Sequence, residues 1–159
     1  MISDFANRFT DLQIVFGNPS LFDTDGDELM REVLYPVAPP EIAARVKTPQ
    51  DMMQFTLIEV STHRASWPHL FESLRLSHGQ ARYFFADNSL MAAELSTNGM
   101  GIALARAPAS DRIMQVSGLV PCLPGISVPG QEAYHLIYPD RAALRPPART
   151  FRDWLLDNV

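Results

Sequence analysis

The chain lacks sequence features that characterise several classes of protein. Among its 159 residues Cys122 is the one cysteine, which excludes an internal disulfide framework and agrees with a reducing compartment. The sequence contains no run of about 18 apolar residues, so we expect no membrane-spanning segment. The opening residues, Met1 to Asp4, have neither the charged nor the apolar region of a signal peptide. Together these absences predict a soluble, cytoplasmic protein.

Positive charge is scarce as well. Thirteen Lys and Arg residues against 18 Asp and Glu residues give a formal net charge of -5, and the basic residues form no cluster along the chain. A protein that binds DNA through its phosphates needs such a basic patch. We therefore expect that this chain alone does not bind nucleic acid.

Motifs for catalysis and for metal binding are also missing. The acidic loop from Asp23 to Glu28 lacks the glycine and the glutamate that an EF-hand requires at its sixth and twelfth positions. The histidines show no metal-ligand spacing, and Cys122 lies in a proline-rich stretch without a neighbouring histidine. We expect no metal, no cofactor and no catalytic residue, although a triad assembled from distant residues stays an open alternative.

Stretches typical of strands and of helices alternate along the chain, which predicts an α/β protein with a largely parallel sheet. Strands are expected at residues 11–17, 32–37, 56–60, 81–86, 102–105 and 133–138, and loops at 18–27 and 121–130. Helices are expected at 41–46, from 48, from 66, at 90–97 and from 146. The helix at 90–97 should end at Asn98-Gly99 with a left-handed residue. Phe151, Trp154 and Leu155 are predicted to form the inner face of the last helix.

One local feature indicates a binding site. A strand that ends in Phe84-Phe85-Ala86 continues into Asp87-Asn88-Ser89, a run of residues that favour the start of a helix. Free N–H groups at a helix start, next to aromatic side chains, suit a small polar or anionic molecule. The alternative is that these residues only cap the helix.

Several segments, taken in order, resemble the effector domains of LysR-type transcriptional regulators, especially the branch of the glycine-cleavage and β-lactamase activators. Asp4-Phe5 followed by 11–17 is similar to the family's "DF…vDlaIRyG", and 29–39 to "L…E.L.PVCSP". The other matching segments are 48–52, 57–58 with Trp67, 90–104, 118–121, 134–139 and 151–155.

The resemblance implies a type 2 periplasmic-binding-protein-like fold, in which two α/β lobes are joined by two crossover strands, here 35–39 and 134–139. Residues 1–39 and 133–159 would form a partial first lobe with the crossover strands, and 40–132 the second lobe. Full regulators begin with a winged helix-turn-helix and a linker helix, and the resemblance places Met1 inside the first lobe. We therefore expect an N-terminally truncated chain with an incomplete first lobe.

The resemblance also implies an effector cleft. Donors at 87–89 would hold the polar end of an amino acid or a small carboxylate, and Phe16 and Phe85 would contact its apolar part, whereas Trp67 and Trp154 are assigned to packing. The implied ligand-binding residues are Phe16, Gly17, Asn18, Pro39, Ser61, Thr62, Phe85, Ala86, Asp87, Asn88 and Ser89.

These observations favour an effector-sensing domain that forms a homo-oligomer and reaches DNA only through a separate helix-turn-helix domain. Two alternatives stay open. One is a truncated relic or decoy that retains only the capacity to fold and dimerise, and the other, more remote, is an enzyme.

Overall fold

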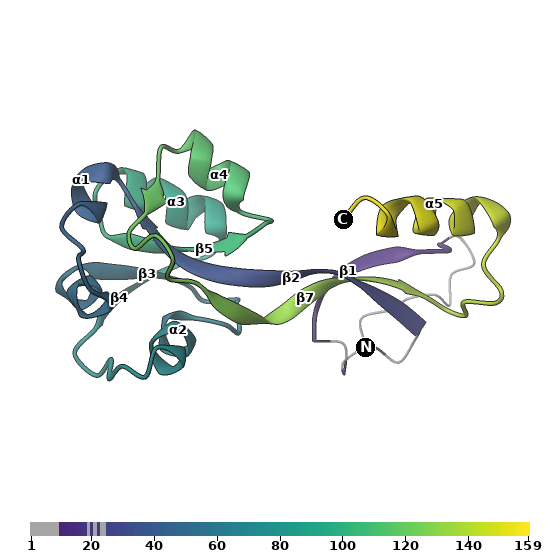
Figure 1. The fold of residues 1–159 in the computed structure, drawn as a ribbon, viewed down its shortest axis with the longest axis horizontal. Coiled ribbons are helices and arrows are strands. Elements are labelled where there is room, and N and C mark those ends of the chain that lie inside the picture. Colours follow the sequence, from purple (N-terminus) through teal and green to yellow (C-terminus); the bar gives the residue numbers. More distant parts are fainter. Residues whose placement is uncertain (1–9, 19, 21, 23–24) are drawn as a thin grey trace. The chain divides into compact units, whose positions relative to one another are not determined.

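The structure is a computed structural model, and it describes residues 10–18, 20, 22 and 25–159 (Figure 1). The chain divides into two compact units. Unit 1 comprises Met1–Glu32 and Gln131–Val159, and unit 2 is the continuous stretch Val33–Gly130. The predicted lobe boundaries, 1–39 with 133–159 and 40–132, stay a prediction.

The described residues form strands and helices in the alternation expected of an α/β protein. The strands are β1 (Gln13–Gly17), β2 (Asp25–Ala38), β3 (Thr56–Val60), β4 (Arg82–Ala86), β5 (Ile102–Ala107), β6 (Val120–Pro121) and β7 (Val128–Tyr138). The helices are α1 (Pro40–Ala43), the 3₁₀ helix η2 (Pro49–Gln54), α2 (Trp67–Ser73), α3 (Ser89–Thr97), α4 (Asp111–Val116) and α5 (Pro146–Leu156). No helix in this described part is long and apolar enough to cross a membrane.

The sheet is mixed, so the expectation of a largely parallel sheet is wrong. Its strand order is β1-β7-β2-β5-β3-β4, with β6 beside β2. The pairs β3–β4 and β3–β5 are parallel, because α2 and α3 return the chain to the same end of the sheet. The pairs β1–β7, β2–β5 and β2–β6 are antiparallel. Both β2 and β7 contain residues of both units. The assignment of 35–39 and 134–139 as the crossover strands stays a prediction.

Unit 2 has a hydrophobic core on each face of its sheet, because successive strand residues point to opposite faces. Leu57 of β3 packs with Trp67 and Phe71 of α2, whereas its neighbour Ile58 packs with Ala92 and other residues of α3 and α4. Figure 1 shows α2 on one side of β3 and β4, and α3 and α4 on the other. Consecutive residues of β3 therefore serve different faces of the sheet.

Unit 1 has a smaller core of its own. Leu136 and Tyr138 of β7 pack with Leu144 and Ala148, and half-buried Leu155 adds to this cluster from α5. The Tyr138 hydroxyl donates to Oδ2 of Asp27 at 2.6 Å, which links the start of β2 to β7.

Several predicted boundaries need correction. Residues 25–27 belong to β2, although their acidic side chains predicted a loop, because Asp27 pairs with Tyr138 and with Arg141. The 121–130 segment contributes Pro121 to β6 and residues 128–130 to β7, and α4 was not predicted. The segment after Thr48 is a 3₁₀ helix, whose start is stabilised by the Asp51 carboxylate accepting from the Thr48 amide at 2.8 Å.

The predicted inner face of α5 is also wrong in part. Phe151 and Trp154 are exposed, and only Leu155 of the three joins the core. The two aromatic rings instead contact each other, with centroids 6.0 Å apart. The helical spacing was correct, but the core of unit 1 contacts a different stripe of the helix, which includes Ala148.

Candidate functional site

The carboxyl ends of β3 and β4 lie side by side in unit 2. Glu59 pairs with Phe85 and Val60 with Ala86 in the parallel register, and the Ser61 amide donates to the Ala86 carbonyl at 3.2 Å. The structure therefore brings the predicted Ser61-Thr62 segment next to the predicted segment from Phe85 onward. Carboxyl ends of parallel strands are a common place for ligands in α/β proteins.

The start of α3 follows directly from β4. Asn88 is the N-cap residue, and its Oδ1 accepts a hydrogen bond from the Met91 amide at 2.9 Å. Asp87 is exposed and Ser89 is half-buried at the first helical position, whereas Ala86 is buried. The capping role of Asn88 is thus present, and α3 begins directly after the carboxyl end of β4.

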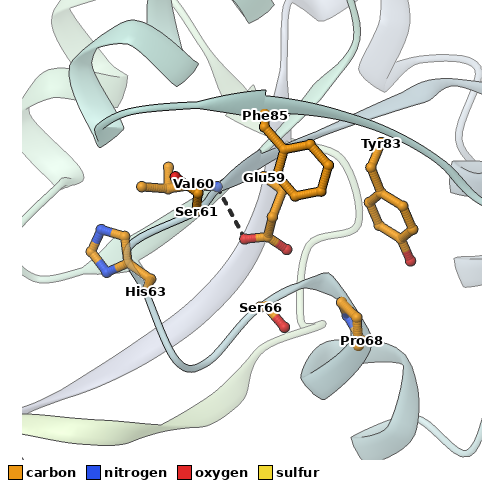
Figure 2. Close-up of a pocket in the computed structure, with 8 residues that line it drawn as sticks. All are labelled: Glu59, Val60, Ser61, His63, Ser66, Pro68, Tyr83 and Phe85. Atoms are coloured by element: carbon orange, nitrogen blue, oxygen red, sulfur yellow. Dashed lines mark hydrogen bonds between the residues drawn. The ribbon is translucent and has the colours of Figure 1, made fainter.

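A pocket of about 330 Å³ opens on the α2 side of these strand ends. Its eight lining residues are Glu59, Val60, Ser61, His63, Ser66, Pro68, Tyr83 and Phe85. Figure 2 shows the Glu59 carboxylate at its centre, next to the rings of Phe85 and Tyr83 and facing Ser66 and Pro68. Phe85 is 64% exposed although it is large and apolar, so its ring forms a wall that water contacts.

Glu59 is a buried charged group with defined partners. Its side chain is 6% exposed, Oε1 accepts from the Val60 amide at 3.0 Å, and Oε2 accepts from the Trp67 amide at 2.8 Å. Burial raises the pKa of Glu59, whereas the two amides and the charge of Arg106 oppose that increase. Because Trp67 is the first residue of α2, the carboxylate also stabilises the start of that helix.

The other titratable groups of the pocket are uncharged at neutral pH. Burial and the charge of Arg106 lower the pKa of His63 to about 4. Burial raises the pKa of Tyr83, and the Glu59 charge adds to that increase. Glu59 is the one carboxyl group among the eight lining residues, which include no Lys or Arg.

Comparison with known proteins identifies the family to which this chain belongs. The family model described as the LysR substrate binding domain matches residues 2–159. The chain belongs to the LysR substrate-binding domain family. An HTH-type transcriptional regulator of Sinorhizobium fredii, y4mQ, is 31% identical over 95% of this chain and 51% of its own length. The HTH-type transcriptional regulator PerR of Escherichia coli is 27% identical over 94% of this chain and 50% of its own length.

Solved structures agree with the sequence comparison. The effector domain of the transcriptional regulator AmpR from Pseudomonas aeruginosa has a TM-score of 0.76 and 27% identity, covering 98% of this chain and 75% of that one. The AmpR effector binding domain of Citrobacter freundii has a TM-score of 0.75 at 22% identity, covering 98% of this chain and 77% of that one. The chain is a LysR-type effector-binding domain with a type 2 periplasmic-binding-protein-like fold, and it spans about half the length of the curated relatives.

The predicted ligand-binding residues of this LysR domain fall in both units. Phe16, Gly17 and Asn18 belong to unit 1, where the Phe16 ring lies 4.8 Å from that of Tyr134 and the Asn18 Oδ1 accepts from the Ser20 amide at 3.0 Å. The others belong to unit 2. Of these, Ser61 and Phe85 line the pocket, and Pro39 is a buried residue before α1 that does not.

Most of the pocket of the LysR domain was not predicted from the sequence. Glu59, His63, Ser66, Pro68 and Tyr83 were not singled out, although Glu59 had a detectable signal as the one acidic residue inside an otherwise apolar strand. His63 and Ser66 lie in a loop whose path local sequence does not define.

Cys122 is a free, buried cysteine. Burial raises the pKa of the Cys122 thiol to about 12. Across residues 10–18, 20, 22 and 25–159, no group of three His, Cys, Asp or Glu side chains is placed to hold a metal ion.

Proposed function

We propose that this domain senses its small-molecule effector at the carboxyl ends of β3 and β4 in unit 2. The observation that carries the proposal is the pocket at these strand ends, which includes the predicted residues Ser61 and Phe85. The start of α3 follows β4 directly in the chain. An aromatic wall next to convergent polar groups is typical of small-molecule sites. For Phe16, Gly17 and Asn18 of unit 1, the predicted role in ligand binding stays a proposal of its own.

The proposed effector is an amino acid or a small carboxylate. Amides at the start of α3, with Asn88 and Ser89, would hold its carboxylate, and the Phe85 ring would contact its apolar part. Binding alone accounts for the function in this proposal, so the domain is not an enzyme. No feature of the described residues favours a relic or a decoy over a working sensor.

A thermal-shift screen of amino acids and small carboxylates tests this proposal. At a ligand concentration of 100 times Kd, a true effector stabilises the folded protein by about 2.7 kcal/mol, which raises Tm by a readily measured amount. The combined variant Phe85→Ala and Asn88→Ala should lose that shift. Phe84→Ala combined with Asn98→Ala changes the same residue types on β4 and at the end of α3, and should retain it. A shift that survives the first pair would place the site elsewhere.

Control of transcription is proposed for the longer protein, with DNA contacts made by a separate domain in the cytoplasm. The chain itself carries a net charge of -5, and like charge repels the DNA phosphates. We expect no sequence-dependent complex in a gel shift at low salt with promoter-like and random duplexes. A sharp complex with one sequence would contradict this part of the proposal.

A further inference from the structure

The pocket that contains Glu59 has one carboxyl group and no Lys or Arg among its eight lining residues. We propose that the ligand part bound in this pocket is a positively charged amine that pairs with the Glu59 carboxylate. The inference rests on the proposed function, because the pocket is part of the proposed effector site. It makes an amine-bearing compound the preferred effector and disfavours a plain carboxylic acid in this pocket.

The hydrogen bonds of Glu59 leave it able to accept more. Each of its oxygens accepts one backbone N–H, from Val60 at 3.0 Å and from Trp67 at 2.8 Å. An ionised carboxylate has about four acceptor positions. Figure 2 shows the carboxylate within the pocket, with the Phe85 ring above it, the Tyr83 ring to its right, and Ser66 and Pro68 below it. A bound ammonium group can therefore reach a charged acceptor without displacing the contacts that stabilise α2.

The charges around Glu59 favour a cation over an anion. The lining residues from β3, β4, α2 and the 61–66 loop include no Lys or Arg, and His63 is neutral because its pKa is lowered to about 4. Arg106 of β5 is itself 5% exposed, donates to the Ala65 carbonyl, and is not among the lining residues. Its charge favours the ionised form of Glu59. A ligand carboxylate placed here would meet a like charge at short range.

Two aromatic rings in the pocket also favour a bound cation. Phe85 and Tyr83 both belong to β4, two residues apart and so on the same face of the strand. Figure 2 shows both rings on one side of the carboxylate. The face of an aromatic ring attracts a cation within about 6 Å of its centroid. A pocket of about 330 Å³ suits a small amine with one ring or a short aliphatic body.

Three ligands of similar shape and different charge test the inference: benzylamine, benzyl alcohol and benzoate. In calorimetric titrations of the whole chain at neutral pH, we expect benzylamine to bind at least tenfold more tightly than benzyl alcohol, and benzoate to bind most weakly. Glu59→Gln keeps an acceptor for the Trp67 amide but removes the charge, so the preference for benzylamine should disappear. Glu94→Gln neutralises an exposed carboxylate on α3 and should leave the preference intact.

Other outcomes would overturn the inference. Equal binding of the amine and the alcohol, tighter binding of benzoate, no binding of any of the three, or a preference that survives Glu59→Gln would each do so. If Glu59→Gln does not fold, Phe85→Ala takes its place, with Phe84→Ala as its control: benzylamine binding that Phe85→Ala leaves unchanged overturns the inference. None of these results decides the proposed function, which depends separately on the amino-acid and carboxylate screen.

Discussion

Gly101, at the start of β5, lies against the backbone of Thr56. A Cβ atom at this position would come within 2.0 Å of the Thr56 carbonyl oxygen, and backbone cannot move aside as a flexible side chain can. We expect Gly101→Ala to lower the free energy of unfolding by about 3 kcal/mol or more. Gly79→Ala is the matched control, because nothing lies within 4 Å of its Cβ position. Urea denaturation of both variants measures the difference, and equal stability would show that the β3–β5 contact is looser than described.

Predictions for single residues were correct where neighbouring residues in the sequence determine the conformation. Gly99 has a φ of +77°, as expected for the left-handed residue after α3, and Asn88 caps the same helix. Local chemistry determines both. The roles of Glu59 and Arg106 depend on neighbours distant in the chain, because Arg106 donates to the Ala65 carbonyl and acts on Glu59 across the sheet. No local pattern predicts such contacts.

The helices α2 and α5 each contain a tryptophan, and these two tryptophan side chains differ in their burial. Trp67 at the start of α2 is fully buried and its indole N–H donates to the Ile58 carbonyl at 2.9 Å, whereas Trp154 of α5 is 57% exposed. We expect Trp67→Ala to cost about 3–5 kcal/mol of stability and Trp154→Ala to change it by no more than about 0.5 kcal/mol. Chemical denaturation compares the two. A large loss of stability in Trp154→Ala would contradict the exposed position of this side chain on α5.

Elements were predictable where apolar periodicity and boundary residues agreed. Thr56–Val60 was predicted to the residue, and α2 and α3 to within one or two residues of their starts. The signals for α4 were present, with Ser110 before it and Gly118 in a left-handed conformation after it, but the helix has only six residues. A helix this short has little intrinsic stability, and here it depends on packing of Met114 in the core.

At the scale of the whole molecule, β1 is an edge strand of the sheet order, with β7 as its neighbour. Its Ile14 is 55% exposed, whereas Leu12 and Phe16, also predicted to be exposed, are half-buried. Edge strands with apolar side chains are templates for pairing with another chain. Effector domains of this family form oligomers, so we predict a dimer or larger assembly with β1 at or near the interface. The predicted interface also includes residues 5–9, which lie outside the described residues.

Light scattering on dilute protein measures the predicted association. Ile14→Lys should shift the population toward a 17.8 kDa monomer, because it places a charge on the proposed contact. Val116→Lys should not, although Val116 is 76% exposed, because it lies on α4 in unit 2. A stable monomer of the unchanged chain would contradict the prediction.

The path of the chain through the two units also determines the order in which they can be completed on the ribosome. Unit 2 is one uninterrupted stretch, so all of its strands and helices are available once residue 130 has been synthesised. The β1 strand must wait, because its residue 17 pairs with residue 133 and its residue 13 with residue 137. Domains tend to fold as their last residues emerge. The nascent chain would therefore fold from its middle outward, and its first strand would be among the last to find its partner.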